Sequence, residues 1–136
     1  MAEQRPYRVM KPGHEVFWEY CDKGELRLQS CEACQQISWP PTKACLHCGD
    51  ERLTWKRMSG RGKIKSWCQF HQDYYRGVMK TPYDAILVEL DEGAFFMSNP
   101  EGMTYEDIEY EMPVKVTFKA CEDQAGEFSL PVFKRA

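Results

Sequence analysis

Four cysteines in two Cys-x-x-Cys turns are the residues of this chain with the clearest chemistry. Cys31 and Cys34 frame one turn, Cys45 and Cys48 frame the other, and ten residues separate the two turns. Two such turns supply the four sulfur ligands of a tetrahedral zinc ion. The alternative is two disulfides or two redox centres, but a thioredoxin-like redox motif is one pair beside a βαβ pattern. The spacing therefore predicts one Zn²⁺ per chain.

The predicted zinc site is closed to substrate. Four protein ligands complete a tetrahedral coordination sphere, so the metal is expected to be structural. Its binding energy replaces the hydrophobic core that so short a segment lacks. His47 lies between the ligands Cys45 and Cys48 and could compete as a ligand, but with four cysteines present we expect it at the surface. Gly49 follows directly, where the backbone must fold back with a positive φ.

The composition is typical of a small protein in a reducing compartment. The chain has 136 residues, enough for one ordinary domain or for a domain with a small module. Residues 1–11 do not resemble a signal peptide, and no apolar run approaches the roughly 20 residues of a membrane span. Seven cysteines in such a chain predict a cytoplasmic protein, in which Cys21, Cys68 and Cys121 are free, buried thiols.

Charge is distributed unevenly along the chain, although the net charge is only −3. Residues 56–80 hold seven Lys or Arg and one acid, whereas residues 81–114 hold nine acids and no Lys or Arg. One part of the surface is therefore expected to suit a polyanion, unless these charges only solvate the outer faces of strands. The acidic balance argues against a dedicated nucleic-acid-binding protein.

The order of expected elements predicts two β modules behind a short helix. Residues 1–12 lack periodicity and are expected to form a flexible or docking arm, and residues 13–23 have helical spacing. After Gly60-Arg61-Gly62 we expect five strands, with one helical turn at Thr104–Asp107 between the third and the fourth. That order is typical of an OB-fold, a small, partly open barrel. The predicted fold is therefore mainly β: 1–24 as arm and helix, 25–58 as a rubredoxin-like zinc ribbon, and 59–136 as a five-stranded OB-fold barrel.

The predicted helix carries more aromatic surface than one buried stripe needs. Phe17, Trp18 and Tyr20 fall on several sides of a helix that is too short to be stable alone. It must therefore lie against a surface, which is either the rest of this chain or a partner subunit. For a partner subunit, these three aromatic residues are the candidate contacts.

With both modules placed, the chain resembles a family of bacterial and archaeal proteins that join an N-terminal helix, a rubredoxin-like zinc ribbon and an OB-fold. The resemblance covers essentially the whole chain after residue 12. Two features depart from the family: Glu111 stands where such proteins often have glycine, and Asp73-Tyr74-Tyr75 is particular to this chain. The residues that carry the resemblance are Phe17-Trp18, the four cysteines, Gly60-Arg61-Gly62-Lys63, Ser66, Pro82-Tyr83, Glu92-Gly93 and the run from Pro113 to Phe118.

The resemblance implies an accessory subunit, similar to the zinc-finger subunit of degradative thiolases such as benzoylsuccinyl-CoA thiolase. In that family a thiolase-type partner supplies the acyl-CoA chemistry, and the accessory subunit stabilises it and shapes the acyl-CoA site. The residues agree, since such chemistry needs an activated cysteine beside a base. Cys68 and His71 are three apart on a predicted strand, which places them on opposite faces. We expect this chain alone to be catalytically silent.

A set of cations and aromatic residues at the joint and in the first barrel loop could contact the nucleotide end of CoA. Its phosphates need cations, and its base needs a ring to stack on. The candidate CoA-binding residues are Arg61, Lys63, Lys65, Trp67, Tyr74, Tyr75, Arg76 and Lys80. The alternative function is a single-stranded nucleic-acid-binding module, because OB-folds use the same residue types to stack bases.

Overall fold

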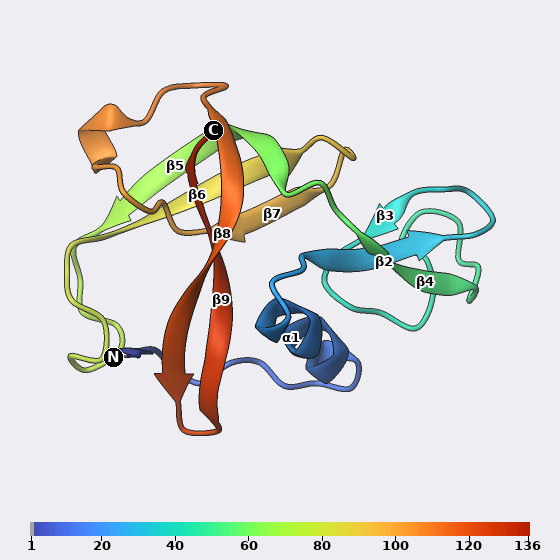
Figure 1. The fold of residues 1–136 in the computed structure, drawn as a ribbon, viewed down its shortest axis with the longest axis horizontal. Helices are drawn as coiled ribbons and strands as arrows, with labels where there is room; N and C mark the ends of the chain where they lie inside the picture. Colours follow the sequence, from blue (N-terminus) through green and yellow to red (C-terminus); the bar gives the residue numbers. More distant parts are fainter. Residues whose placement is uncertain (1) are drawn as a thin grey trace.

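Two β-sheets and one α-helix form the computed structural model, which describes residues 2–136 (Figure 1). The smaller sheet has the order β3-β2-β4, and the larger has the order β1-β8-β5-β6-β7, with β9 paired to β8. The mainly β prediction is confirmed. The strands are β1 (Glu3–Gln4), β2 (Arg27–Cys31), β3 (Ile37–Ser38), β4 (Leu53–Arg57), β5 (Arg61–Phe70), β6 (Tyr83–Leu90), β7 (Phe95–Ser98), β8 (Pro113–Asp123) and β9 (Gly126–Arg135).

The single helix α1 (His14–Asp22) joins the cores of the two sheets. It contacts β2 of the smaller sheet and β9 of the larger one. Phe17 is 2% exposed, and its ring lies 4.5 Å from that of Trp39 and 6.2 Å from that of Phe96. One buried aromatic cluster therefore fixes the ribbon, the helix and the barrel together.

Alternate side chains of the central strand β6 point into the core of the larger sheet. Ile86, Val88 and Leu90 of β6 are buried, and β6 lies between β5 and β7. Ile64 of β5 lies opposite Val88, and Phe96 of β7 lies opposite the same residue on the other side. Five strands follow the joint, and the 3₁₀ turn η1 (Tyr105–Asp107) precedes the fourth, which confirms the predicted order.

The predicted joint at Gly60-Arg61-Gly62 is explained by close packing. A side chain at Gly62 would place its Cβ 2.5 Å from the carbonyl oxygen of Glu89, because β5 crosses β6 closely here. Gly60 has a φ of 79°, and a Cβ there would lie 2.5 Å from Val116. Both positions therefore require glycine where the chain enters the barrel.

A β-bulge in β5 changes which of its side chains face the core. The register shifts between Ile64 and Ser66, so Trp67 lies opposite the buried Ile86. Trp67 consequently packs against the core, and Cys68 is exposed. The prediction of three buried free thiols is right for Cys21 and Cys121 and wrong for Cys68, because strict alternation does not continue through a bulge.

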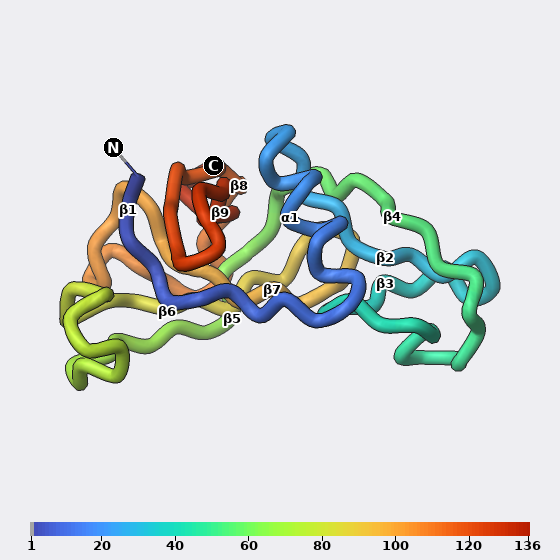
Figure 2. The backbone as a smooth tube through the Cα atoms, turned by 90° about the horizontal axis from the view of Figure 1, so that it is seen from below, coloured from blue at the N-terminus to red at the C-terminus, as the bar shows by residue number. Residues whose placement is uncertain are grey.

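The N-terminal arm docks onto the larger sheet. β1 pairs with β8 in parallel, with Glu3 opposite Cys121. The arm then runs along the lower side of the molecule to α1, past the loop of residues 71–82 that joins β5 to β6 (Figure 2). Arg8 donates to Asp123 at 2.7 Å, and its guanidinium lies 4.0 Å from the ring of Phe128. Of the two expected forms of this segment, the docking arm is therefore found.

The barrel stays partly open between β7 and β9. In the described residues no backbone ladder joins β7 to β9. The Ser98 hydroxyl at the end of β7 donates to the Pro131 carbonyl at 2.8 Å. Just after β7, the Phe133 amide donates to the Asn99 carbonyl at 3.1 Å, and the Glu101 amide donates to the Phe133 carbonyl at 2.8 Å. In the part of the chain that the structure describes, no helix has the length and apolarity needed to cross a membrane.

Candidate zinc centre and surface groove

The four predicted ligands converge between the two cysteine turns. The sulfurs of Cys31, Cys34, Cys45 and Cys48 all lie within 4.8 Å of one another. The Cys31–Cys48 distance is 3.6 Å, and the Cys34–Cys45 distance is 3.5 Å. A Zn–S bond length of about 2.3 Å and tetrahedral angles place sulfurs about 3.8 Å apart. The residues present therefore fit one tetrahedral Zn²⁺ with four thiolate ligands.

The two turns share one backbone design, although one contains glycine and the other does not. In the first, the Gln35 amide donates to the Cys31 carbonyl at 2.9 Å, and in the second, the Gly49 amide donates to the Cys45 carbonyl at 3.0 Å. Gln35 has a φ of 65°, and Gly49 has a φ of 81°. The positive φ expected at Gly49 is thus present in both turns.

Backbone amides favour the thiolate form of one ligand. The Cys48 amide, as the largest cause, and the His47 amide, which donates to the sulfur at 3.3 Å, lower the pKa of Cys45. Zinc binds cysteine as the thiolate, and these amides stabilise that form at this ligand. The His47 ring itself is exposed, and its Nε2 lies 3.1 Å from the Ile37 carbonyl oxygen. The expectation that His47 lies at the surface is confirmed.

Two buried polar side chains hold the segment between the two cysteine turns. Neither residue was a candidate from the sequence. Gln29 donates to the Thr42 carbonyl at 3.0 Å and accepts from the Thr42 amide at 2.8 Å. The hydroxyl of Ser38, which is fully buried, accepts from the Leu46 amide at 3.1 Å. These contacts join residues far apart in the chain, so no local pattern could have revealed them.

The aromatic residues of α1 face their own chain more than the sequence suggested. Phe17 is buried, so of the two surfaces expected for the helix, this residue lies against its own chain. The half-buried Trp18 packs edge-on against Phe128, with ring centroids 5.2 Å apart. The half-buried Tyr20 lies 4.7 Å from the guanidinium of Arg27. Contact of Trp18 and Tyr20 with a partner stays a prediction.

The eight candidate CoA residues do not lie together in the fold. Arg61 starts β5 near the ribbon, whereas the loop of residues 71–82 follows the other end of β5, about 30 Å away at 3.3 Å per residue (Figure 1). Lys65 between them forms an ion pair with Glu111 at 3.1 Å, and Trp67 faces the core. Two separate groups remain: Arg61 with Lys63, and Tyr74, Tyr75, Arg76 and Lys80 in the loop.

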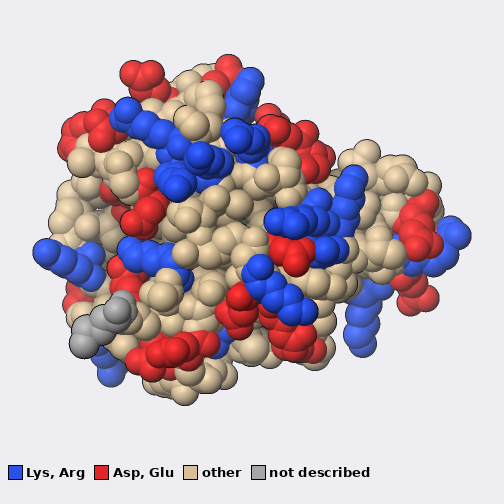
Figure 3. Space-filling model, viewed as in Figure 1, with Lys and Arg blue, Asp and Glu red and all other residues tan. Residues whose placement is uncertain are grey.

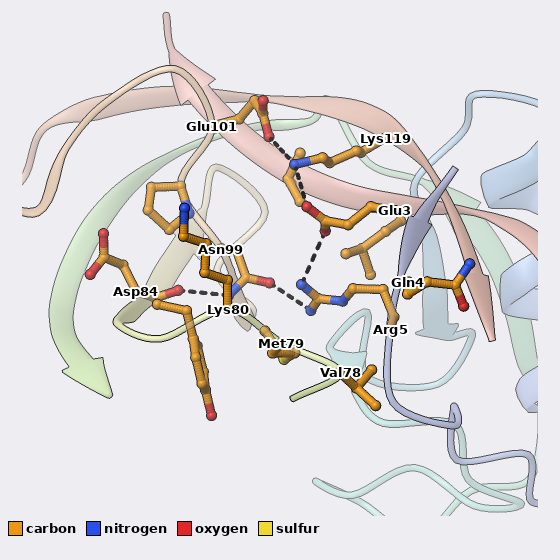
Figure 4. A pocket seen from close by; sticks show the side chains of 14 residues that line it. Glu3, Gln4, Arg5, Val78, Met79, Lys80, Asp84, Asn99, Glu101 and Lys119 are labelled. Atoms are coloured by element: carbon orange, nitrogen blue, oxygen red, sulfur yellow. Dashed lines mark hydrogen bonds and ion pairs between the residues drawn. The ribbon is translucent and has the colours of Figure 1, made fainter. Parts of the chain in front are cut away.

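A groove of about 290 Å³ opens between the N-terminal arm, this loop and β8 (Figure 4). Arg5 reaches across it and donates to the Asn99 side chain at 3.0 Å. Lys119 lies between Glu3, at 3.1 Å, and Glu101, at 3.4 Å. Figure 4 shows that Lys80 and Met79 of the loop form the opposite wall. Of the residues that line this groove, Lys80 alone belongs to the set expected from the sequence, because the arm and β8 come together only in the fold.

A second hollow of about 290 Å³ adjoins this groove and is more aromatic. Trp18, Tyr75 and Phe128 line it, and it shares Arg5 and Tyr83 with the first groove. Burial raises the pKa of Tyr83 above its ordinary value, and its protonated hydroxyl can donate a hydrogen bond. We name the two hollows together the arm groove. Cations, a phenol and apolar rings in one groove suit a ligand with both polar and apolar parts.

Two family models match the chain, and both describe ChsH2. The model of the ChsH2 rubredoxin-like zinc ribbon domain matches residues 18–54, and the model of the ChsH2 C-terminal OB-fold domain matches residues 55–119. The chain therefore belongs to the zinc-ribbon and OB-fold family of ChsH2. This confirms the resemblance, the fold class and the prediction of one structural Zn²⁺ in the ribbon.

Individual relatives agree with this assignment. A protein of Thermomonospora curvata named probable enoyl-CoA hydratase alpha subunit is 31% identical over 141 residues, which is 99% of this chain and 43% of that protein. This chain therefore spans less than half of that relative. A solved structure titled Ltp2-ChsH2(DUF35) aldolase has a TM-score of 0.82 at 28% identity, covering 95% of this chain and 98% of that one. A DUF35-family protein of unknown function from Sulfolobus solfataricus, at 16% identity over 81% of both chains, has a TM-score of 0.60 and shows the fold alone.

Proposed function

We propose that this chain is a non-catalytic accessory subunit of a thiolase-type enzyme complex that acts on acyl-CoA. The observation that carries the proposal is the likeness to the structure titled Ltp2-ChsH2(DUF35) aldolase, which extends over 98% of the matched chain. That title joins a ChsH2 chain to a second protein, and the Thermomonospora relative is named as one subunit of an acyl-CoA enzyme. Both names support a role beside a catalytic partner.

In this proposal the chain acts as a preformed scaffold. The zinc ion fixes the ribbon, and the cluster around Phe17 fixes the ribbon to the barrel, so the docking surface loses little entropy on binding. The exposed parts of Trp18 and Tyr20 are the proposed partner contacts on α1. The division into residues 1–24, 25–58 and 59–136 and the cytoplasmic location also belong to this proposal.

The proposed contact with acyl-CoA lies at the arm groove. Tyr75 and Lys80 come from the set expected from the sequence, and Arg5 and Tyr83 join them in the fold. The Asp73 carboxylate accepts from the Gly77 amide at 2.8 Å and thereby holds the turn that presents Tyr75. A ring to stack on and a cation beside it suit the adenine base and the phosphate groups of CoA.

Co-expression with thiolase-type proteins encoded near its gene tests the accessory role. We expect one of these proteins to co-elute with the tagged chain in size-exclusion chromatography, and the acyl-CoA activity of the complex to exceed that of the partner alone. A complex with no more activity than the partner alone would refute the proposal. Tight binding of a single-stranded oligonucleotide at physiological salt, without any partner binding, would favour the nucleic-acid alternative instead.

A further inference from the structure

A row of cations crosses three neighbouring strands of the larger sheet. Arg61 of β5 lies directly opposite Lys115 of β8, and Lys115 lies directly opposite Lys134 of β9. Lys63 follows Arg61 by two residues on β5 and therefore shares its face. Arg61, Lys63 and Lys134 are exposed, and Lys115 is half-buried. We name these four residues the cation row. Figure 3 shows Lys and Arg side chains gathered over the upper part of β5 and β8.

The arrangement costs stability, and no ion pair among the described residues offsets it. Like charges directly opposite each other in a sheet are destabilising, and Lys115 has a cation on both sides. In residues 2–136, no member of the cation row forms an ion pair within 4.0 Å, although Lys65 of β5 and Lys119 of β8 both do. Glu89 lies opposite Lys63 in the register without such a pair. An external anion would remove the repulsion.

The spacing of the row selects the kind of anion. Neighbouring strands lie about 4.8 Å apart, so the stems of Arg61, Lys115 and Lys134 repeat at that interval. An extended acidic peptide presents carboxylates on one side only every second residue, about 6.7 Å apart, and does not match this interval. Two linked phosphates place several charged oxygens within about 4.8 Å, and the Arg61 guanidinium can bind one phosphate with two parallel hydrogen bonds.

We propose that the cation row is a binding site for the diphosphate group of a small phosphorylated ligand. Lys115 is its central residue, because it alone has cations on both neighbouring strands. Arg61 and Lys63 are among the residues expected from the sequence to bind a phosphate, whereas Lys115 and Lys134 lie more than 50 residues further along the chain and join them only in the sheet. The site does not depend on a partner subunit.

Titration of the zinc-loaded full chain with inorganic diphosphate tests the site. At low ionic strength we expect saturable binding by calorimetry, with NMR shifts of backbone amides centred on Arg61, Lys115 and Lys134. Lys115→Gln should weaken binding about tenfold, as expected for the loss of one hydrogen bond to a charged group. Lys43→Gln is the matched control, since Lys43 is exposed on the ribbon and the substitution removes the same charge.

Each other outcome has a defined meaning. Equal diphosphate affinity of Lys115→Gln and Lys43→Gln would overturn the proposal, as would amide shifts located elsewhere. A single-stranded oligonucleotide that binds the row more tightly than diphosphate would identify a nucleic-acid surface and would also overturn it. Diphosphate binding without any catalytic partner supports this site and leaves the accessory role to be judged by co-elution. Co-elution without diphosphate binding supports the accessory role and rejects this site.

Discussion

At the scale of single residues, the zinc ligands are the best defined feature. Cys31→Ser or Cys48→Ser should abolish binding of the one Zn²⁺ and unfold the ribbon, because apo zinc ribbons have little core and metal binding supplies their folding energy. Metal content by elemental analysis and the thermal unfolding curve measure both effects. A variant without zinc but with an unchanged melting temperature would contradict this prediction.

The remaining cysteines provide the controls for this experiment. Cys68→Ser and Cys121→Ser should keep one zinc ion per chain, because their sulfurs lie outside the ligand cluster. Cys121 is buried, so its substitution is also expected to lower the melting temperature, whereas that of the exposed Cys68 is not. Loss of zinc in either variant would show that the ligand set has been wrongly chosen.

The Arg8–Asp123 pair is expected to fasten the N-terminal arm. The Asp123 side chain is fully buried, so Asp123→Asn should lower the free energy of unfolding by about 3 kcal/mol, as for a broken buried ion pair. Hydrogen exchange and limited proteolysis of residues 2–12 should become faster. Arg52→Gln, which breaks the exposed pair with Asp50, is the control and should change little.

The same pair predicts how stability depends on pH. The Arg8 guanidinium, as the largest cause, lowers the pKa of Asp123 in the folded state. Its contribution is therefore complete above the ordinary carboxyl pKa of about 3.9 and is lost as the pH falls through the lower folded value. Chemical denaturation should show that the difference between wild type and Asp123→Asn shrinks under acid. A difference that stays constant down to the folded pKa and below would contradict this account.

At the scale of elements, local patterns predicted most strands but not their faces. The five strands expected after the joint are present as β5 to β9, and the helical turn expected at Thr104–Asp107 is η1. The bulge in β5 could not be predicted, because it depends on pairing with β6, and it decides that Trp67 is inward and Cys68 outward. The ligands of the zinc site were predictable because all four lie within eighteen consecutive residues.

Helix α1 packs against its own chain through Phe17, although the sequence alone left open whether this residue contacts a partner. Phe17→Ala should lower the free energy of unfolding by about 3–5 kcal/mol, because the removed ring leaves a cavity between Trp39 and Phe96. Chemical denaturation of the isolated chain measures this loss. Glu19→Ala, an exposed position on the same helix, is the control and should stay within about 0.5 kcal/mol of wild type. Equal stability of the two variants would contradict this prediction and would make Phe17 a candidate partner contact again.

At the scale of the whole molecule, the arm groove and the cation row depend on contacts between distant segments. Arg5 and Asn99 meet across the groove, and Arg61 and Lys115 meet across two strands. Composition indicated that cations and aromatic residues cluster in residues 56–80, yet β5 separates them into two groups. The sequence shows that these residues are cations and aromatic residues. Which of them lie side by side depends on how the strands pair in the sheet.

The arm groove leads to the kinetic prediction for the complex with its proposed partner. If Tyr75 and Lys80 contact acyl-CoA away from the reacting thioester, their binding energy is equal in the ground and transition states. Tyr75→Ala and Lys80→Ala should therefore raise KM for the acyl-CoA substrate and leave kcat nearly unchanged, with a larger effect of Lys80→Ala at low salt. Arg76→Ala is the matched control, since Arg76 lies in the same exposed loop but lines neither hollow of the groove. Steady-state kinetics of the reconstituted complex provide the measurement. An unchanged KM for both variants would exclude the arm groove as a substrate contact, and a fall in kcat alone would place these residues nearer to the chemistry than the proposal allows.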